Sequence, residues 1–144
     1  MHPNDFKERL EDETIVAAIR EAEARTSGEI RVFVTRHSPR DPMAEARRQF
    51  FKLRMHQTPE RNGVLLYFAP RSRRFAIVGD DGIHQRCGQE FWDRTAVAMS
   101  GLLKANEWTG AIVAGIREAG VELARHFPKP SGDLNDLPDS VVRD

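Results

Sequence analysis

The sequence has a single cysteine, no excess of charge and no long apolar run. Cys87, being alone, excludes an internal disulfide framework and a cysteine-rich zinc module. The 22 basic and 22 acidic side chains cancel, so no overall field attracts nucleic acid or an anionic membrane. No apolar stretch approaches the ~20 residues of a membrane span, and the first residues lack the apolar segment of a signal peptide. We therefore expect a soluble, cytoplasmic protein with no nucleic-acid partner and no membrane span.

The sequence also lacks the motifs of several large enzyme classes. It contains no Gly-x-Ser-x-Gly elbow, no Gly-x-x-x-x-Gly-Lys loop, no His-Glu-x-x-His and no Gly-x-Gly-x-x-Gly. The usual hydrolase, P-loop and dinucleotide-binding interpretations are therefore without support.

What the sequence does have is the size and composition of one globular domain. Its 144 residues are 40% hydrophobic and 31% charged, and a domain of this length buries roughly 68–70% of the surface of its unfolded chain. We expect residues 1–127 to form this domain. Residues 128–144 contain three prolines and little to bury, which predicts a flexible tail.

Apolar residues recur at three- and four-residue spacing in four segments, which predicts four helices. The first begins with Asp12 as N-cap, and the second begins with Asp41 as N-cap followed by proline. The third and fourth cover about 84–104 and 109–126. Trp108 lies between these two helices and is expected to be partly exposed. The residues of the last two helices predicted to face the core are Phe91, Trp92, Val97, Leu102, Ile112, Val113, Ile116, Val121 and Leu123.

Three segments predict β-strands. Residues 29–35 alternate, residues 63–69 are apolar throughout as in a central strand, and residues 74–79 follow a short turn. This turn is too short for a crossover, so the last two strands must be antiparallel. The helix between the first two strands predicts that these are parallel with a right-handed crossover. The expected fold is a three-layer α/β/α sandwich with a small mixed sheet.

This topology sorts the loops into two chemically different ends. Residues 26–29, 58–62 and 80–82 meet at an end rich in carboxylates and hydroxyls. The opposite end is basic, and two interpretations of it stay open: a site for phosphate or an anionic surface, and an ordinary solvated loop end, which we favour. The basic residues concerned are Arg36, His37, Arg40, Arg71, Arg73 and Arg74.

The acidic end is a candidate site for a divalent cation. Glu29, Asp80 and Asp81 supply carboxylates and Asn62 an amide oxygen, the ligands that Ca²⁺ or Mg²⁺ prefers. A bound cation would also relieve the repulsion between the two adjacent aspartates. The alternative is that Asp-Asp-Gly is an ordinary turn and helix-capping sequence. His84, which follows, is either an acid, base or ligand, or simply a residue that packs at a helix start.

Several ordered segments resemble the TPM domain family, which has thylakoid-lumen and nematode members. They recur from about residue 10 to 128, and the Asn-Gly-Val-Leu strand followed by the Gly-Asp-x-Gly-Ile turn is the most specific part. The resemblance implies an α/β/α sandwich, divalent-cation binding in loops at one edge of the sheet, and phosphatase or ATP/ADP-hydrolysing activity in some members. Other members resemble assembly, repair or receptor-accessory factors. The resembling segments are 26–30, 41–42, 61–65, 75–84 and 91–92.

The resemblance places the cation loops at residues 27–29, 61–62 and 80–81, and less strongly at Asp41. Two functions follow as hypotheses. The first is a weak metal-dependent phosphohydrolase that acts on a nucleotide or another phosphate-bearing small molecule. In it Arg61 steadies the transferring group, and Asp81 or His84 serves as the base. The alternative is a non-catalytic, cation-stabilised module that binds a protein partner. In either case we expect a monomer.

Overall fold

Four strands form one mixed sheet in the computed structural model, which describes residues 11–129 and 141–144. The strands are β1 (Glu29–Val34), β2 (Gly63–Ala69), β3 (Arg74–Gly79) and β4 (Val141–Arg143). Their spatial order is β3-β2-β1-β4. β1 runs parallel to β2 and to β4, whereas β2 and β3 are antiparallel. The pairings predicted for the first three strands are confirmed.

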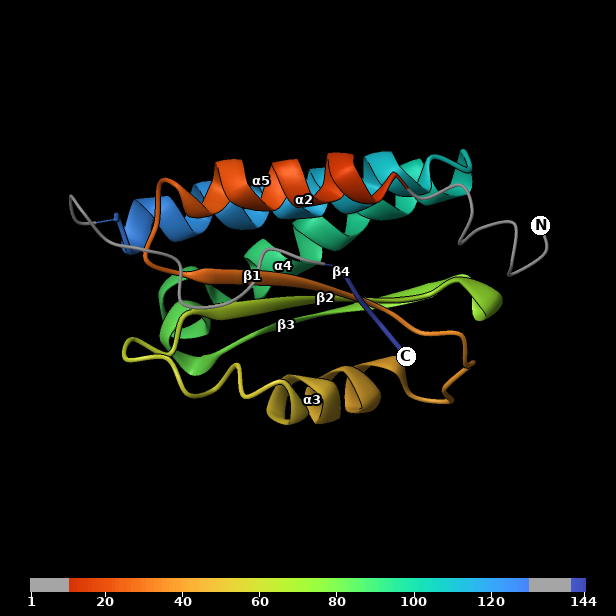
Figure 1. Cartoon of the computed structure of the whole chain (residues 1–144), viewed down its shortest axis with the longest axis horizontal. Coiled ribbons are helices and arrows are strands. Elements are labelled where there is room, and N and C mark those ends of the chain that lie inside the picture. Colours follow the sequence, from red (N-terminus) through yellow and green to blue (C-terminus); the bar gives the residue numbers. More distant parts are fainter. Residues whose placement is uncertain (1–10, 130–140) are drawn as a thin grey trace.

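Helices cover both faces of this sheet, which confirms the predicted sandwich (Figure 1). On one face lie α2 (Asp12–Glu23), α4 (Asp81–Lys104) and α5 (Trp108–His126). On the other face lies α3 (Pro42–Lys52), and the short 3-10 helix η1 (Pro70–Ser72) joins β2 to β3.

The apolar sequence of β2 results from its position inside the sheet. All of its residues are buried. Leu66 and Phe68 belong to the core under α2, α4 and α5, whereas Leu65 and Tyr67 belong to the smaller core under α3. A strand with helices on both faces cannot alternate apolar and polar residues, since both sets of side chains are buried.

The two helix starts predicted from capping residues have different outcomes. Asp41 precedes α3, and its carboxylate accepts a hydrogen bond from Ala44 N at 3.1 Å, with Pro42 at the first position, so this prediction is confirmed. For α2 the prediction is wrong, because Glu11 takes the N-cap position and Asp12 lies in the first turn. In the first turn, the negative charge of Asp12 still stabilises the helix, because it lies near the positive end of the helix dipole.

α4 begins three residues earlier than the predicted start at about residue 84. Asp80 is its N-cap and accepts a hydrogen bond from Asp81 N at 2.8 Å. The helix is kinked at Gly88, whose φ of 75° lies in the left-handed region that glycine tolerates. The Asp-Asp-Gly sequence therefore starts a helix, which confirms the interpretation of this segment as a turn and helix-capping sequence.

Three core predictions on α4 and α5 are wrong. Val97 and Val121 are 73% and 69% exposed, whereas Trp108, expected to be partly exposed, is only 5% exposed. These two helices pack side by side above the sheet, so a residue on the outer side of either helix has no further layer to cover it. Apolar character alone does not reveal which side is outer.

The end of the chain differs from the flexible tail expected over residues 128–144. Residues 130–140 lie outside the described part, but Val141–Arg143 forms β4 alongside β1. Asp144 then accepts hydrogen bonds from the Thr35 hydroxyl at 2.5 Å and from Arg36 N at 2.9 Å. Two valines suffice for this short strand because β1 offers it a free, buried edge.

Candidate functional site

Three polar segments meet at one end of the sheet, as the chain direction predicted. Glu29 at the start of β1 lies opposite Gly63 at the start of β2, and Val64 lies opposite Gly79 at the end of β3. Asp80 N donates a hydrogen bond to Gly63 O at 2.9 Å, which continues this ladder. The loop before β2 and the start of α4 are therefore neighbours.

The central contact at this end joins Arg61 to Asp80. The guanidinium donates from Nε to Asp80 Oδ2 at 2.7 Å and from Nη2 to Asp80 Oδ1 at 2.8 Å. The Asp80 side chain is 5% exposed, whereas that of Asp81, whose Oδ2 lies 3.8 Å from Arg61 Nη2, is 77% exposed. The hydrogen bonds and the charge of Asp80 raise the pKa of Arg61 above its ordinary value. The ion pair is bidentate, and its two members differ in exposure, because Asp80 is buried whereas Arg61 is partly exposed to solvent.

Gly82 allows the loop before β2 to pack against the start of α4. A Cβ atom at this position would lie 2.1 Å from Glu60 O and 2.5 Å from Arg61 O. Any larger residue would push the loop away, because both nearest atoms are backbone. The close approach is what places Arg61 beside Asp80.

The four predicted cation ligands are not gathered into one group. Asn62 is 1% exposed and donates from Nδ2 to Ser27 Oγ at 3.2 Å, so it joins two loops. Glu29 is buried in β1, two strands from Asp80, a backbone separation of about 10 Å. Within residues 11–129 and 141–144, no three His, Cys, Asp or Glu side chains are arranged to hold a metal ion. Asp80 and Asp81 are together; Glu29 and Asn62 are apart from them.

Arg61, Asp80, Asp81 and His84 all line one groove, of about 350 Å³, between α3, β3 and the start of α4. The three residues predicted to act in catalysis therefore share one hollow. α3 adds Arg47, which sequence analysis missed. Nothing in the local sequence distinguishes Arg47 from its neighbours, since its role depends on how α3 docks under the sheet. The other residues of the groove are Met43, Phe50, Phe51, Ile77, Val78, Gly79, Gln89 and Trp92.

Trp92 fixes the orientation of His84. Trp92 Nε1 donates a hydrogen bond to His84 Nδ1 at 3.1 Å. The imidazole therefore accepts at Nδ1, and in its neutral form it carries its proton on Nε2. Trp92, predicted as a core residue and 6% exposed, also forms part of the wall of the groove.

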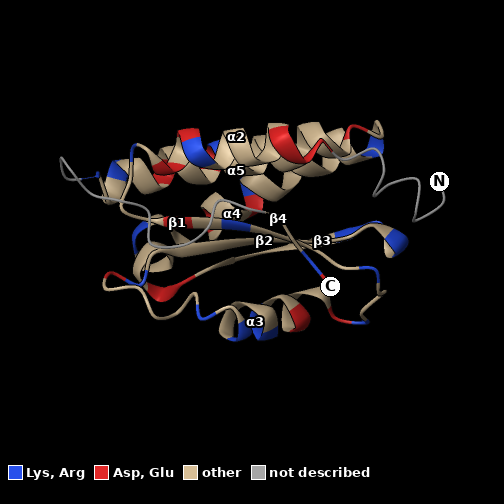
Figure 2. Cartoon of the chain, in the orientation of Figure 1, with Lys and Arg blue, Asp and Glu red and all other residues tan. Residues whose placement is uncertain are grey.

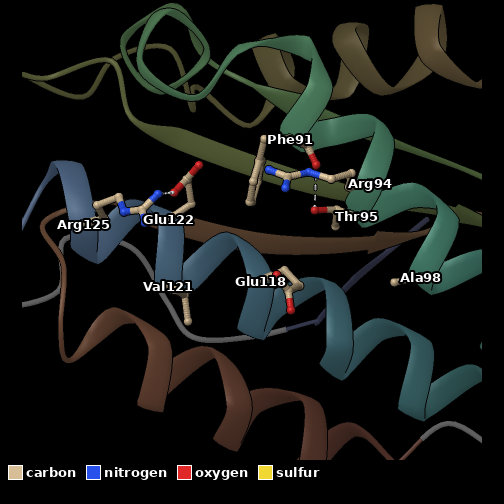
Figure 3. Close-up of a pocket in the computed structure, with 8 residues that line it drawn as sticks. All are labelled: Phe91, Arg94, Thr95, Ala98, Glu118, Val121, Glu122 and Arg125. Atoms are coloured by element: carbon tan, nitrogen blue, oxygen red, sulfur yellow. Dashed lines mark hydrogen bonds and ion pairs between the residues drawn. The ribbon is translucent and has the colours of Figure 1, made fainter.

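A second hollow, of about 410 Å³, lies between α4 and α5 (Figure 3). Arg94 from α4 and Arg125, Glu118 and Glu122 from α5 line it, and Arg125 Nη1 lies 3.3 Å from Glu122 Oε1. Opposite charges balance one another here, so this hollow has no preference for an anion or a cation.

The basic end of the sheet is gathered as predicted (Figure 2). Arg74 Nη1 donates to Arg40 O at 3.2 Å, and His37 Nε2 lies 3.8 Å from the carboxylate of Asp144. Figure 2 shows Lys and Arg at the turn between β2 and β3 and acidic residues at the other end of β3. In the sequence, arginines therefore precede the apolar residues of β3 and aspartates follow them, although Arg61 pairs with Asp80 at the acidic end.

Comparison with known proteins agrees with this fold. The model of the TPM domain matches residues 4–122. This chain belongs to the TPM domain family. None of the described helices is long and apolar enough to cross a bilayer. A search of curated proteins finds no match.

Two solved structures are similar to this one. The BA42 protein from the psychrophilic bacterium Bizionia argentinensis matches with a TM-score of 0.87 and 37% identity, over 94% of this chain and 96% of that chain. The N-terminal domain of the cg2496 protein from Corynebacterium glutamicum matches with a TM-score of 0.62 and 19% identity, over 85% of this chain and 76% of that chain. At this lower identity the second likeness concerns the fold alone.

Proposed function

We propose that this TPM domain binds phosphate-bearing small molecules, such as nucleotides, together with a divalent cation, and slowly hydrolyses them in the groove beside α4. The observation that carries the proposal is the meeting of Arg61, Asp81 and His84 in one hollow of about 350 Å³. Arginine, carboxylate and imidazole are the groups that phosphoryl transfer uses to bind, to neutralise charge and to move a proton.

Arg61 is suited to hold a phosphate because Asp80 orients it. Its contacts with Asp80 use Nε and Nη2, and a guanidinium has further N–H donors on Nη1. Arg47 lines the same groove from the opposite side and is exposed. Two arginines facing one hollow can clamp a phosphate between them.

The acidic residues suit Mg²⁺ better than Ca²⁺. Ca²⁺ takes 6–8 oxygen ligands, whereas Mg²⁺ is commonly held by one or two carboxylates together with the substrate phosphates. Asp81 is exposed beside the buried Asp80, whose oxygens are occupied by Arg61. We therefore expect the cation to bind with the phosphate rather than before it. When bound, such an ion neutralises phosphate charge and activates water.

His84 is placed to donate a hydrogen bond to the substrate. Its Nδ1 accepts from Trp92 Nε1, so Nε2 is the atom left for substrate. In hydrolysis, water adds to phosphorus, the bond to the leaving oxygen breaks, and one of the protons of that water ends on the leaving oxygen, to which His84 Nε2–H donates a hydrogen bond. Phe50, Phe51 and Trp92 also line the groove, and their rings offer an apolar surface against which a nucleobase or another aromatic group can pack.

The experiment is turnover and binding of ATP, ADP and p-nitrophenyl phosphate with Mg²⁺, with Ca²⁺ and with EDTA. Arg47→Ala and Asp81→Ala alter exposed groove residues and should leave the fold intact. Each should lower turnover about 100-fold, the usual effect of removing one transition-state contact. The matched controls are Arg48→Ala on α3 and Glu90→Ala on α4, which are exposed outside the groove.

Calorimetry separates binding from catalysis. We expect Mg²⁺ to bind weakly alone and more tightly when ADP is present. Turnover that persists in EDTA, or that falls equally in the control variants, would overturn the proposal. Nucleotide binding without turnover would retain the ligand and reject the hydrolysis.

A further inference from the structure

β3 forms one edge of the sheet, and its outer side is unpaired. The strand order is β3-β2-β1-β4, and no strand in the described part of the chain pairs with the far side of β3. A strand edge of this kind is a template for another strand unless something covers it.

The ladder with β2 identifies which backbone groups of β3 point outward. Asp80 N donates to Gly63 O, and the register pairs Val78 with Leu65 and Ala76 with Tyr67. In an antiparallel ladder the hydrogen-bonded residues alternate, and each directs both its N–H and its C=O the same way. Asp80, Val78 and Ala76 therefore bond to β2. The residues whose N–H and C=O face outward are Phe75, Ile77 and Gly79.

Two hollows run along this edge, with residues of α3 on one side and of α4 on the other. One is the groove of about 350 Å³ that contains Ile77, Val78 and Gly79. The other, of about 260 Å³, lies along Phe75, Ala76 and Ile77. The side chains of Phe75, Ala76, Ile77 and Val78 are apolar, and Phe75, Ile77 and Val78 are only partly buried.

We propose that the β3 edge pairs antiparallel with β3 of a second copy of this chain. This departs from the monomer expected from the sequence, and the added strand would fill the groove proposed above for the phosphate ligand, so that strand pairing and ligand binding would exclude each other. One register pairs all three outward residues: Ile77 lies opposite itself, and Phe75 lies opposite Gly79 in both directions. A two-fold axis at Ile77 makes the interface self-complementary.

The charges at the two ends of β3 select the same register and the same occupant. Arg73 and Arg74 precede the strand's apolar residues and are exposed; Asp80 and the exposed Asp81 follow them. With Ile77 on the axis, the exposed Arg73 and Arg74 of one copy come to the end of β3 at which the exposed Asp81 of the second copy lies. A parallel partner would bring like charges together at both ends, which is unfavourable. The charges at the two ends of β3 are thus complementary to those of an antiparallel second copy.

Disulfide trapping tests this register. In an antiparallel hydrogen-bonded pair the Cα atoms are about 5.5 Å apart, within the range that a disulfide spans. Ile77→Cys in a Cys87→Ala background should form a covalent dimer under mild oxidation. Val97→Cys in the same background is the control for chance collision, because this residue is exposed on α4. Absence of the dimer, or equal crosslinking of both variants, would overturn the proposal.

Sedimentation equilibrium of the full chain tests the charges without cysteines. Arg73→Asp should weaken self-association about tenfold, since symmetry breaks two exposed ion pairs at once. The double variant Arg73→Asp/Asp81→Arg restores opposite charges and should recover the association. A chain that sediments as a monomer at every concentration, or that binds an extended segment of another protein there instead, contradicts a second copy as the occupant.

Discussion

At the scale of single residues, the position of Cys87 in the fold determines the acidity of its thiol. Burial, and after it the negative charge of Glu122, raises the pKa of the Cys87 thiol to about 11. The thiolate is the reactive form, and below this pKa nearly all of the thiol is neutral. A neutral thiol of this kind packs as a small apolar side chain does.

We predict that Cys87 reacts slowly with iodoacetamide at neutral pH. The thiolate fraction should be about a hundredfold smaller than for an ordinary cysteine, and the rate should rise with pH until about 11. Mass spectrometry after timed alkylation measures it, with the urea-unfolded chain as control. A rate that levels off near pH 9 in the folded protein would contradict the burial argument.

The residues of the groove show how far sequence reasoning reaches at this scale. The meeting of Arg61 with Asp80 and Asp81 at one end follows from strand direction alone. Their bidentate contact does not, because it depends on Arg61 adopting a positive φ of 52° and on the close approach at Gly82. Sequence analysis also missed Arg47, because the way in which α3 packs under the sheet determines which charged residues of this helix line the groove.

At the scale of elements, the start of α4 depends on Gly82. We predict that Gly82→Ala lowers the free energy of unfolding by about 1–3 kcal/mol, as overpacking against backbone does. Gly101→Ala is the matched control, because it lies in the same helix with no atom near its Cβ position. This change should instead stabilise by about 0.5–1 kcal/mol. Urea unfolding measures both, and equal effects would argue against the close approach.

α5 offers a second test, with two apolar residues of opposite exposure. Ile116 is fully buried in the larger core, whereas Val121 is 69% exposed. Ile116→Ala should cost about 2–5 kcal/mol because it leaves a cavity. Val121→Ala should change stability by less than about 0.5 kcal/mol. Thermal and urea unfolding measure the difference; comparable losses would mean that α5 faces the sheet differently.

Element existence and order were largely predictable, but element ends were not. Periodicity found the helices because each needs one apolar side, and the short turn before β3 determined its direction. The start of α4 was placed too late, since Asp-Asp-Gly suits a loop as well as a cap. β4 was not predicted, because three residues carry too little pattern and gain their stability from β1.

At the scale of the whole molecule, the last residues join the chain's end to its first strand. We predict that deleting residues 141–144 lowers the free energy of unfolding by roughly 2 kcal/mol, the size of one or two hydrogen bonds to a charged group. Urea unfolding measures the loss, and Asp144→Ala isolates the share of the side chain. Unfolding curves that superimpose on those of the full chain would show that β4 adds nothing.

Because Trp92 lines the groove and donates a hydrogen bond to His84, its fluorescence should report the binding of a ligand there. The chain has only two tryptophans, and Trp108 is buried at the start of α5. A ligand that enters the groove meets the indole of Trp92 or disturbs its imidazole partner, so the emission of this one ring should change in intensity and colour. Replacing Trp108 by phenylalanine would leave a single fluorophore at the place where the chemistry is expected.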